Sequence, residues 1–199
     1  MKILLIGANG TIGKAVDNEL SQRHEIIRIG RNSGDFQVDI SDSASIRALF
    51  EKTGTFDALV CAAGNVTFAP LGEMNEQSFA LGLQDKLMGQ VNLLLIGREF
   101  ANDGASFTLT SGILNRDPIR SGASAALVNA AIDGFVRAAA IELPRGLRVN
   151  SVSPTVLEEA MDSYGPYFRG YKPVPGADVA LAYAKSVEGL QTGQSYIVG

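Results

Sequence analysis

Three glycines stand at every third residue near the start of the chain. They follow the apolar residues 3–6 and precede an amphipathic run. In this setting the first glycine permits a tight turn, the second lets the backbone approach a pyrophosphate, and the third lets helix and strand pack closely. The positive end of the following helix would face the phosphates. The turn predicts a dinucleotide site whose cofactor-binding residues are Gly7, Asn9, Gly10, Thr11, Ile12 and Gly13.

A basic and polar turn follows the second expected strand, residues 25–29. In a dinucleotide-binding unit the end of this strand lies beside the adenosine ribose, where an acidic residue favours NAD. This chain instead has Arg31, with Asn32 and Ser33 next to it. A guanidinium and a hydroxyl suit a 2′-phosphate, which predicts NADP(H) as the cofactor. The alternative is that Arg31 is an ordinary solvent-exposed arginine of a loop.

The ends of the other expected strands are small or polar, and in a parallel sheet they lie at one edge. Ligands bind beyond the carboxyl ends of such strands, where the strand order switches. Asp39 lies where a side chain could reach the adenine, although a plain turn role fits it equally well. The further cofactor-binding residues predicted at these ends are Asp39, Ile40, Ala62, Ala63, Gly64, Pro154 and Val156.

Strand and helix patterns alternate along the chain. One helical pattern, over residues 76–101, carries apolar residues every fourth position, which predicts one continuous apolar stripe of Phe79, Leu83, Leu87, Val91 and Leu95. Residues 155–175 are expected to be irregular and aromatic. Strands are expected over residues 2–6, 25–29, 36–38, 56–61, 106–110, 147–152 and 195–198, and the other helices over residues 11–22, 43–52, 122–142 and 178–187. The alternation predicts one α/β domain, residues 1–199, with a Rossmann-type doubly wound parallel sheet of about seven strands and helices on both faces.

Composition excludes several classes of protein. The formal charge is 17 − 21 = −4 and no block is rich in Lys or Arg, which argues against nucleic acid or a membrane surface as the main partner. No apolar run reaches the roughly 18 residues of a membrane span. The chain enters a strand at once, so no cleavable signal is expected and the location predicted is cytoplasmic. A single cysteine, Cys61, and a single histidine, His24, leave no internal disulfide and no metal cluster.

The chain resembles the short-chain dehydrogenase/reductase family, most closely a compact bacterial subgroup of chains of about this length. The matching segments are GANGTIG at residues 7–13, AAG at 62–64, LTS at 109–111, RVNSVSP at 148–154 and QTGQS at 191–195. The resemblance implies hydride transfer between NADP(H) and a small-molecule carbonyl or alcohol. It also implies a homodimer through the two long helices, residues 76–101 and 122–142.

The resemblance also indicates an atypical catalytic site. In the family a serine at the end of the fifth strand orients the substrate oxygen, and Ser111 fits that role. A tyrosine and a lysine four residues later, on one face of the second long helix, complete the site. The aligned positions here are Ala125 and Asn129, and none of the five tyrosines has a lysine four residues later. The family's asparagine on the preceding long helix is replaced by Lys86.

Lys86 is therefore the best substitute for the missing proton donor, acting with Ser111 after burial has lowered its pKa toward neutrality. Two other roles stay open for Lys86: contact with the nicotinamide ribose, or a solvent-exposed position on the helix. Two roles are open for Tyr164, Tyr167 and Tyr171: they take part in catalysis, or they form a cover over the crevice. Two functions follow, an NADP-dependent oxidoreductase with a rearranged proton donor, or a catalytically silent NADP(H)-binding sensor or regulatory protein.

Overall fold

The computed structural model describes residues 1–199. Its strands form one seven-stranded parallel sheet. The strand order is β3-β2-β1-β4-β5-β6-β7, so the order reverses between β1 and β4. The strands are β1 (Lys2–Ile6), β2 (Glu25–Gly30), β3 (Phe36–Gln37), β4 (Phe56–Cys61), β5 (Ala101–Thr110), β6 (Arg148–Pro154) and β7 (Ser195–Val198). This arrangement confirms the predicted doubly wound α/β fold and puts the switch point at the carboxyl ends of β1 and β4.

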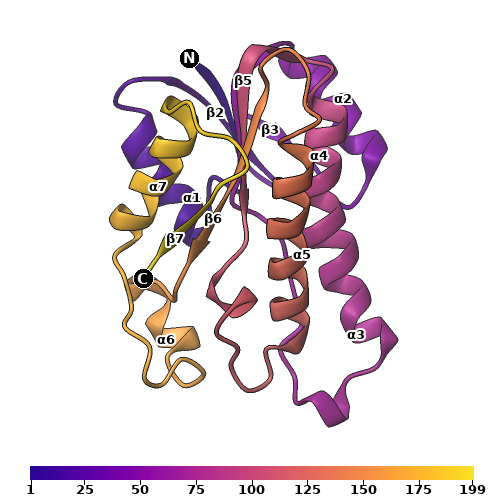
Figure 1. Ribbon diagram of the computed structural model, residues 1–199. Coiled ribbons are helices and arrows are strands. Elements are labelled where there is room, and N and C mark those ends of the chain that lie inside the picture. The colour runs from indigo at the N-terminus through magenta and orange to yellow at the C-terminus, as the bar shows by residue number, and fades with distance from the viewer.

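Helices cover both faces of the sheet (Figure 1). One face carries α1 (Thr11–Leu20) and α7 (Gly176–Glu188), and the other carries α2 (Ser43–Thr53), α4 (Gly89–Gly97) and α5 (Ala123–Ala139). Shorter pieces follow the strand ends, namely η1 (Leu71–Glu73), α3 (Glu76–Leu81), η3 (Ile113–Asn115), η4 (Glu158–Ala160) and α6 (Met161–Tyr164). No helix combines the length and the apolar character that crossing a membrane requires.

Two hydrophobic cores follow from the alternation of side chains along each strand. In β1, Leu4 and Ile6 belong to a cluster of 22 buried residues under α2, α4 and α5. Ile3 and Leu5 point to the opposite face and join a cluster of 16 buried residues under α1 and α7. Burying each such side chain contributes about 1.5–3 kcal/mol. The cores hold the sheet rigid, so its carboxyl edge is a fixed platform.

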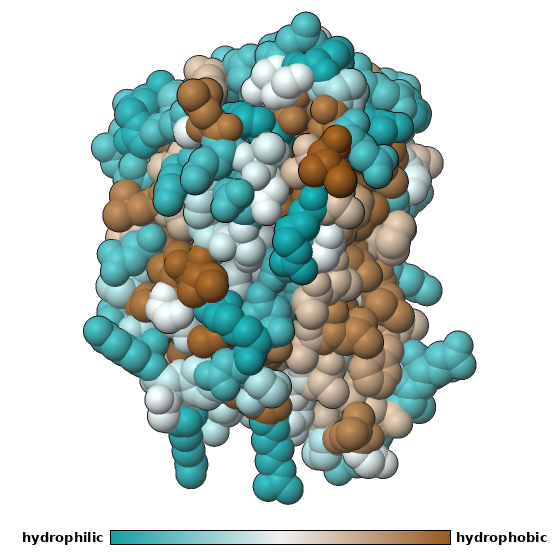
Figure 2. Space-filling view, viewed as in Figure 1, coloured by the Kyte–Doolittle hydropathy of each residue, from teal (hydrophilic) through white to brown (hydrophobic).

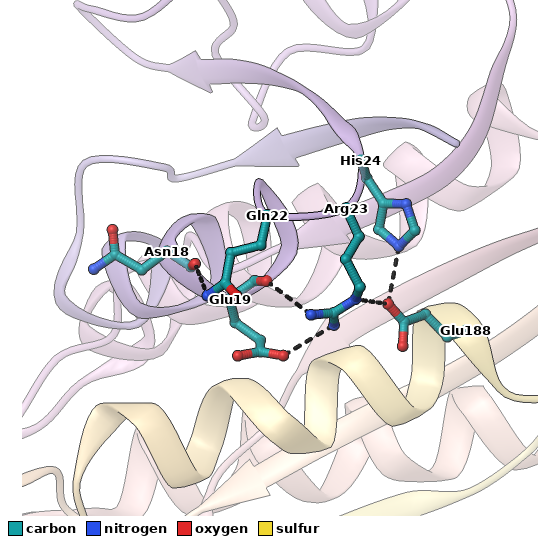
Figure 3. Close-up of polar contacts among 6 residues, drawn as sticks. All are labelled: Asn18, Glu19, Gln22, Arg23, His24 and Glu188. Carbon is teal, nitrogen blue, oxygen red and sulfur yellow. Dashed lines mark hydrogen bonds and ion pairs between the residues drawn. The ribbon is translucent and has the colours of Figure 1, made fainter.

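A polar cluster joins the carboxyl ends of α1 and α7 (Figure 3). Arg23 binds Glu188 through Nε at 2.9 Å and Glu19 through Nη2 at 2.9 Å. His24 Nε2 lies 2.9 Å from the same Glu188 oxygen. Arg23 is largely exposed, so solvent screens its two ion pairs. The cluster therefore links the ends of the two helices but contributes little to the stability of the fold.

The structure corrects the prediction of a single helix over residues 76–101. The segment consists of α3, a π-helix, η2 (Gly82–Met88), and α4, which ends at Gly97. The expected stripe is wrong, because Leu83 and Leu95 are 36% and 40% exposed. Positions four apart drift by about 40° per step around a 3.6-residue helix, and the wider π turn changes the register again. The buried face consists instead of Gly82, Asp85, Gly89, Gln90, Val91, Leu93, Leu94 and Gly97.

The other predicted elements are present with different ends. β5 begins at Ala101 rather than at residue 106, and the added residues include three exposed ones, residues 102–104. α5 ends at Ala139 rather than at residue 142. The segment expected to be irregular, residues 155–175, contains η4 and α6. Cys61 is buried, as expected for a small residue of the core.

Candidate active site

The glycine-rich turn joins β1 to α1 as the spacing predicts. A Cβ atom on Gly13 would lie 2.0 Å from the carbonyl oxygen of Gly7, so only glycine permits this close approach. Gly10 precedes α1 as its N-cap residue and no side chain caps the helix. The first N–H groups of α1 are therefore available to an anionic ligand.

A small pocket of about 80 Å³ lies where β1, β2 and β3 end. Within it, Arg31 Nη2 lies 2.7 Å from Asp39 Oδ2. Hydrogen bonds from Ser41 and the charge of Arg31 lower the pKa of Asp39 to about 2. Arg31 is thus ion-paired, and the pair is 58% and 40% exposed, so it can exchange partners at low cost. The predicted residues that line this pocket are Gly7, Arg31, Asp39, Ile40, Ala63 and Gly64.

Three other predicted residues of the nucleotide end lie outside the small pocket. Asn9 Nδ2 donates to Ser33 Oγ at 2.7 Å, which fastens the glycine-rich turn to the turn after β2. Asn32 is exposed and lines neither pocket. Asn32 therefore has no contact in this structure that supports a role in the site.

A large pocket of about 460 Å³ continues from the small one, and Gly64 lines both. It reaches from the glycine-rich turn to the ends of β5 and β6. The predicted residues that line it are Gly10, Thr11, Ile12, Ala62, Gly64, Lys86, Ser111, Pro154 and Val156. Residues from five separated segments of the chain therefore meet around one cavity.

Lys86 lies inside the large pocket and not in solvent. Its Nζ donates to Asn129 Oδ1 at 2.8 Å and to the Ser111 carbonyl oxygen at 3.2 Å. Gly64, with φ +134°, makes room for it, since a Cβ there would lie 2.6 Å from Lys86 Cγ. Burial lowers the pKa of Lys86 to about 8, against an opposing effect of the Asp133 charge. The third N–H of the ammonium is free for a ligand.

Ser111 presents a hydroxyl with no partner to this pocket. The residue is 3% exposed, and its buried Oγ makes no hydrogen bond. A buried polar group left unpaired costs about 1–3 kcal/mol. A ligand oxygen at this position would recover that free energy, which suits the predicted role of Ser111. Ala125, which also lines the pocket, adds no polar group.

The π-helix places two neighbouring side chains at the site. Asp85, next to Lys86, accepts hydrogen bonds from the Asn65 backbone N–H at 3.2 Å and from Asn65 Nδ2 at 2.9 Å. This holds the loop that carries Gly64. Both residues line the small pocket, and the sequence analysis missed them. No pattern in the sequence distinguishes Asp85 from the polar residues on either side of it, Gln84 and Lys86.

A second missed group is a polar clamp beneath the large pocket. Asp133, which is buried, accepts from Ser151 Oγ at 2.6 Å, from Ser195 Oγ at 3.1 Å and from Asn115 Nδ2. It lies one helical turn after Asn129 on α5. The clamp joins α5, η3, β6 and β7, and the first three of these elements contribute residues to the lining of the pocket.

An aromatic cover lies over the pocket. The ring centroids of Phe68 and Tyr164 are 6.0 Å apart, and those of Phe68 and Tyr167 are 6.4 Å apart. Tyr171 donates its hydroxyl to the Asp117 carbonyl oxygen at 3.2 Å. These contacts favour the interpretation of the three tyrosines as a cover. Of the three, Tyr164 lines the pocket itself.

A parallel sheet of this order, with its glycine-rich turn and its serine at the end of β5, is the framework of a short-chain dehydrogenase/reductase. The chain belongs to that family: the profile described as Enoyl-(Acyl carrier protein) reductase matches residues 7–188. It is 52% identical to the protein lin1944 from Listeria innocua, for which a crystal structure is known. The match covers 100% of this chain and 100% of that chain, with a TM-score of 0.99.

Two further solved structures are similar over nearly their whole lengths. A small-chain dehydrogenase in complex with NADPH is 26% identical, with 100% of this chain and 96% of that chain covered and a TM-score of 0.88. Another small-chain dehydrogenase is 27% identical, with 100% and 95% covered and a TM-score of 0.85. No curated protein matches the chain.

Proposed function

We propose that this protein is an NADP(H)-dependent oxidoreductase that interconverts a small carbonyl compound and its alcohol. The observation that carries the proposal is that Lys86, whose Nζ donates to the Ser111 carbonyl oxygen, and the unpartnered Ser111 hydroxyl line one pocket that continues to the glycine-rich turn. The NADPH bound by a relative of 26% identity and the presence of Arg31 support NADP(H) as the cofactor.

The residues would divide the work as follows. Bound NADP(H) supplies or accepts the hydride. Ser111 Oγ donates a hydrogen bond to the substrate oxygen, and Lys86 Nζ transfers the proton that this oxygen gains or loses. Asn129 Oδ1 holds the ammonium in place at 2.8 Å. A positioned general acid of this kind contributes about 10²–10⁴-fold to the rate.

We propose that Ala125 and Asn129 occupy the positions of the family's tyrosine and lysine, and that Lys86 replaces the lost proton donor. Asn129 then has a different role, because it accepts a hydrogen bond from Lys86. If Lys86 only contacts the ribose, the loss of the tyrosine and lysine leaves a protein that binds the cofactor without turnover. The Lys86→Met variant distinguishes a proton donor from a ribose contact.

The first experiment titrates the wild type and Arg31→Ala with NADPH and with NADH by calorimetry. We expect NADPH to bind more tightly, and Arg31→Ala to weaken NADPH binding about tenfold, the effect of losing one charge-assisted hydrogen bond. NADH binding should change little. Failure of either nucleotide to bind the wild type would overturn the proposal.

The second experiment follows NADPH oxidation with a panel of aldehydes for the wild type, Lys86→Met and Lys52→Met. Lys52 is an exposed lysine at the end of α2 and serves as the matched control. We expect Lys86→Met to lower kcat at least 100-fold while the Kd of NADPH changes less than tenfold. A variant that only weakens NADPH binding would assign Lys86 to the ribose contact.

We further propose that α4 and α5 form a homodimer interface. Figure 2 shows a band of apolar residues running down the face on which Figure 1 places these helices. Met88, Leu95 and Leu127 of this region are 43%, 40% and 45% exposed. Burying such side chains against a second copy would remove that apolar area from water.

A further inference from the structure

A third group of apolar side chains lies outside the two cores, at the carboxyl edge of the sheet. Its five buried members, Ile113, Leu114, Ala125, Val156 and Phe168, all line the large pocket. Val66 and Phe68, which are partly buried, pack against this group and line the pocket as well. We call these seven residues the apolar wall. Val66 also packs against the larger core, whereas the five buried members belong to neither core, so the side of the wall that lines the pocket is available to a ligand.

Charge is confined to one point of the large pocket. Lys86 is the only charged side chain that lines it. Its hydrogen bonds to Asn129 and to the Ser111 carbonyl gather three polar residues into one cluster. A ligand whose oxygen meets this cluster must place the rest of its atoms against the apolar wall. A charge there would be buried without a partner, which costs several kcal/mol.

Aromatic rings frame the same part of the pocket. Phe68 comes from the loop after β4, whereas Tyr164 and Phe168 come from the cover after β6. The planes of Phe68 and Tyr164 meet at 63°, an edge-to-face arrangement. Aromatic side chains pair with a further ring in offset or edge-to-face contacts, which stabilise the pair beyond the burial of apolar area. A flat ring therefore suits this end of the pocket better than a branched polar group.

We infer that the substrate is an uncharged aldehyde or ketone that carries a flat apolar ring beside its carbonyl group; the inference rests on the proposed function. In reduction the carbonyl carbon gains the hydride of NADPH, and the oxygen gains a proton from Lys86 Nζ. The products are the alcohol and NADP⁺, and water returns a proton to Lys86. The ring lies on the apolar wall, under the cover.

The test uses two unreactive amides, so that binding is measured without turnover. The protein saturated with NADPH is titrated by calorimetry with 4-methylbenzamide and with 4-carboxybenzamide. We expect the methyl compound to bind at least tenfold more tightly, because the carboxylate would lie on the apolar wall. Equal or tighter binding of 4-carboxybenzamide, or binding of neither compound, would overturn the inference.

An added cation should reverse this preference in part. Tyr164 is 42% exposed and lines the pocket, so Tyr164→Arg should fold and place a positive charge at its mouth. We expect the ratio of the two dissociation constants to fall at least fivefold in Tyr164→Arg. The matched control is Leu181→Arg, which alters an exposed residue of α7 and should leave the ratio unchanged. An unchanged ratio in Tyr164→Arg would contradict the inferred position of the ring under the cover.

The outcomes also distinguish this inference from the proposed function. Selective binding of 4-methylbenzamide without NADPH oxidation by benzaldehyde or other ring aldehydes would reject the reaction and keep the ligand class. Steady oxidation of NADPH by 4-carboxybenzaldehyde as fast as by 4-methylbenzaldehyde would keep the reaction and reject the ligand class.

Discussion

Lys86 Nζ donates a hydrogen bond to Asn129 Oδ1 at 2.8 Å, which joins residues 43 positions apart on two different helices. The contact orients both side chains: Asn129 turns its Nδ2 toward the Gly112 carbonyl oxygen, and Lys86 keeps one N–H for a ligand. Because the ammonium is buried, its pKa of about 8 lies close to neutral pH. A general acid works best when its pKa lies near the pH of the reaction.

The rate of carbonyl reduction should therefore fall as the pH rises through about 8, the pKa of Lys86. Below this value the ammonium holds the proton that the substrate oxygen gains, and above it that proton is lost. A pH profile of kcat/KM from 6 to 10 would reveal the decline, and Lys52→Met should reproduce it. A flat profile through this range would contradict the role of Lys86.

Lys86→Met should raise the melting temperature at pH 7 while it removes activity. Since burial lowers the pKa of Lys86 in the folded state, the unfolded chain binds its proton more tightly, and the charge costs stability below about pH 8. We expect a gain of about 2–4 °C, corresponding to about 1 kcal/mol. The gain should shrink between pH 8 and pH 10, where the wild-type lysine is increasingly neutral when folded. Scanning calorimetry at pH 7 and at pH 10 would measure the change in melting temperature, and a loss of stability at pH 7 would contradict the prediction.

Asp39→Asn should increase the preference for NADPH over NADH. Asp39 occupies Arg31 at 2.7 Å, so a 2′-phosphate has to compete with this carboxylate. Solvent screens an exposed ion pair of this kind, so the ratio of the two dissociation constants should change by at most about fivefold. In the Arg31→Ala background Asp39→Asn should leave the ratio unchanged. The ratio cancels any contact that Asp39 makes with the adenine, and a decrease would mean that Asp39 holds Arg31 in its productive position.

Asp133→Ala should destabilise the protein by about 3 kcal/mol, because one buried donor and two partly buried donors lose their acceptor. Ser195→Ala removes one of these donors and should cost about 1 kcal/mol. Urea unfolding followed by circular dichroism would measure both. Similar, small effects of the two variants would show that Asp133 is not the centre of the clamp.

Leu127→Glu should convert the proposed homodimer to a monomer, because it places a charge in the apolar band on α5. Light scattering after size-exclusion chromatography would report the mass. Leu190→Glu alters a 93% exposed leucine outside α4 and α5 and is the control. A wild-type mass equal to that of one chain would contradict the proposed homodimer.

The fold could be predicted from the sequence because strand and helix patterns are local. The alternation of strand and helix patterns indicates seven strands, and the glycine-rich turn specifies where the first helix begins. Much of the site could also be predicted, since the carboxyl ends of parallel strands meet at one edge. The glycines were predicted there from their spacing, whereas Ser111 and Lys86 were predicted there from the resemblance to the family.

Other features depend on contacts between distant residues and could not be read from a pattern. The i+4 stripe in residues 76–101 was misleading, because a π-helix needs tertiary contacts to be stable and leaves no mark in apolar spacing. The pairing of Arg31 with Asp39, of Asp85 with Asn65, and of Asp133 with its three donors depends on how separate loops are folded together. Single polar residues carry no information about such partners.

The π-helix has a consequence for insertions and deletions in this chain. Removal of one residue from Gly82–Met88 would let the segment relax to an ordinary α-helix. A π turn holds about one residue more than an α turn, so α3 and α4 would keep nearly the same rotation relative to each other. The side chains within the segment, Lys86 among them, would instead point in new directions around the helix. In this family member the length of a single helical turn, to within one residue, decides whether the amine faces the cavity.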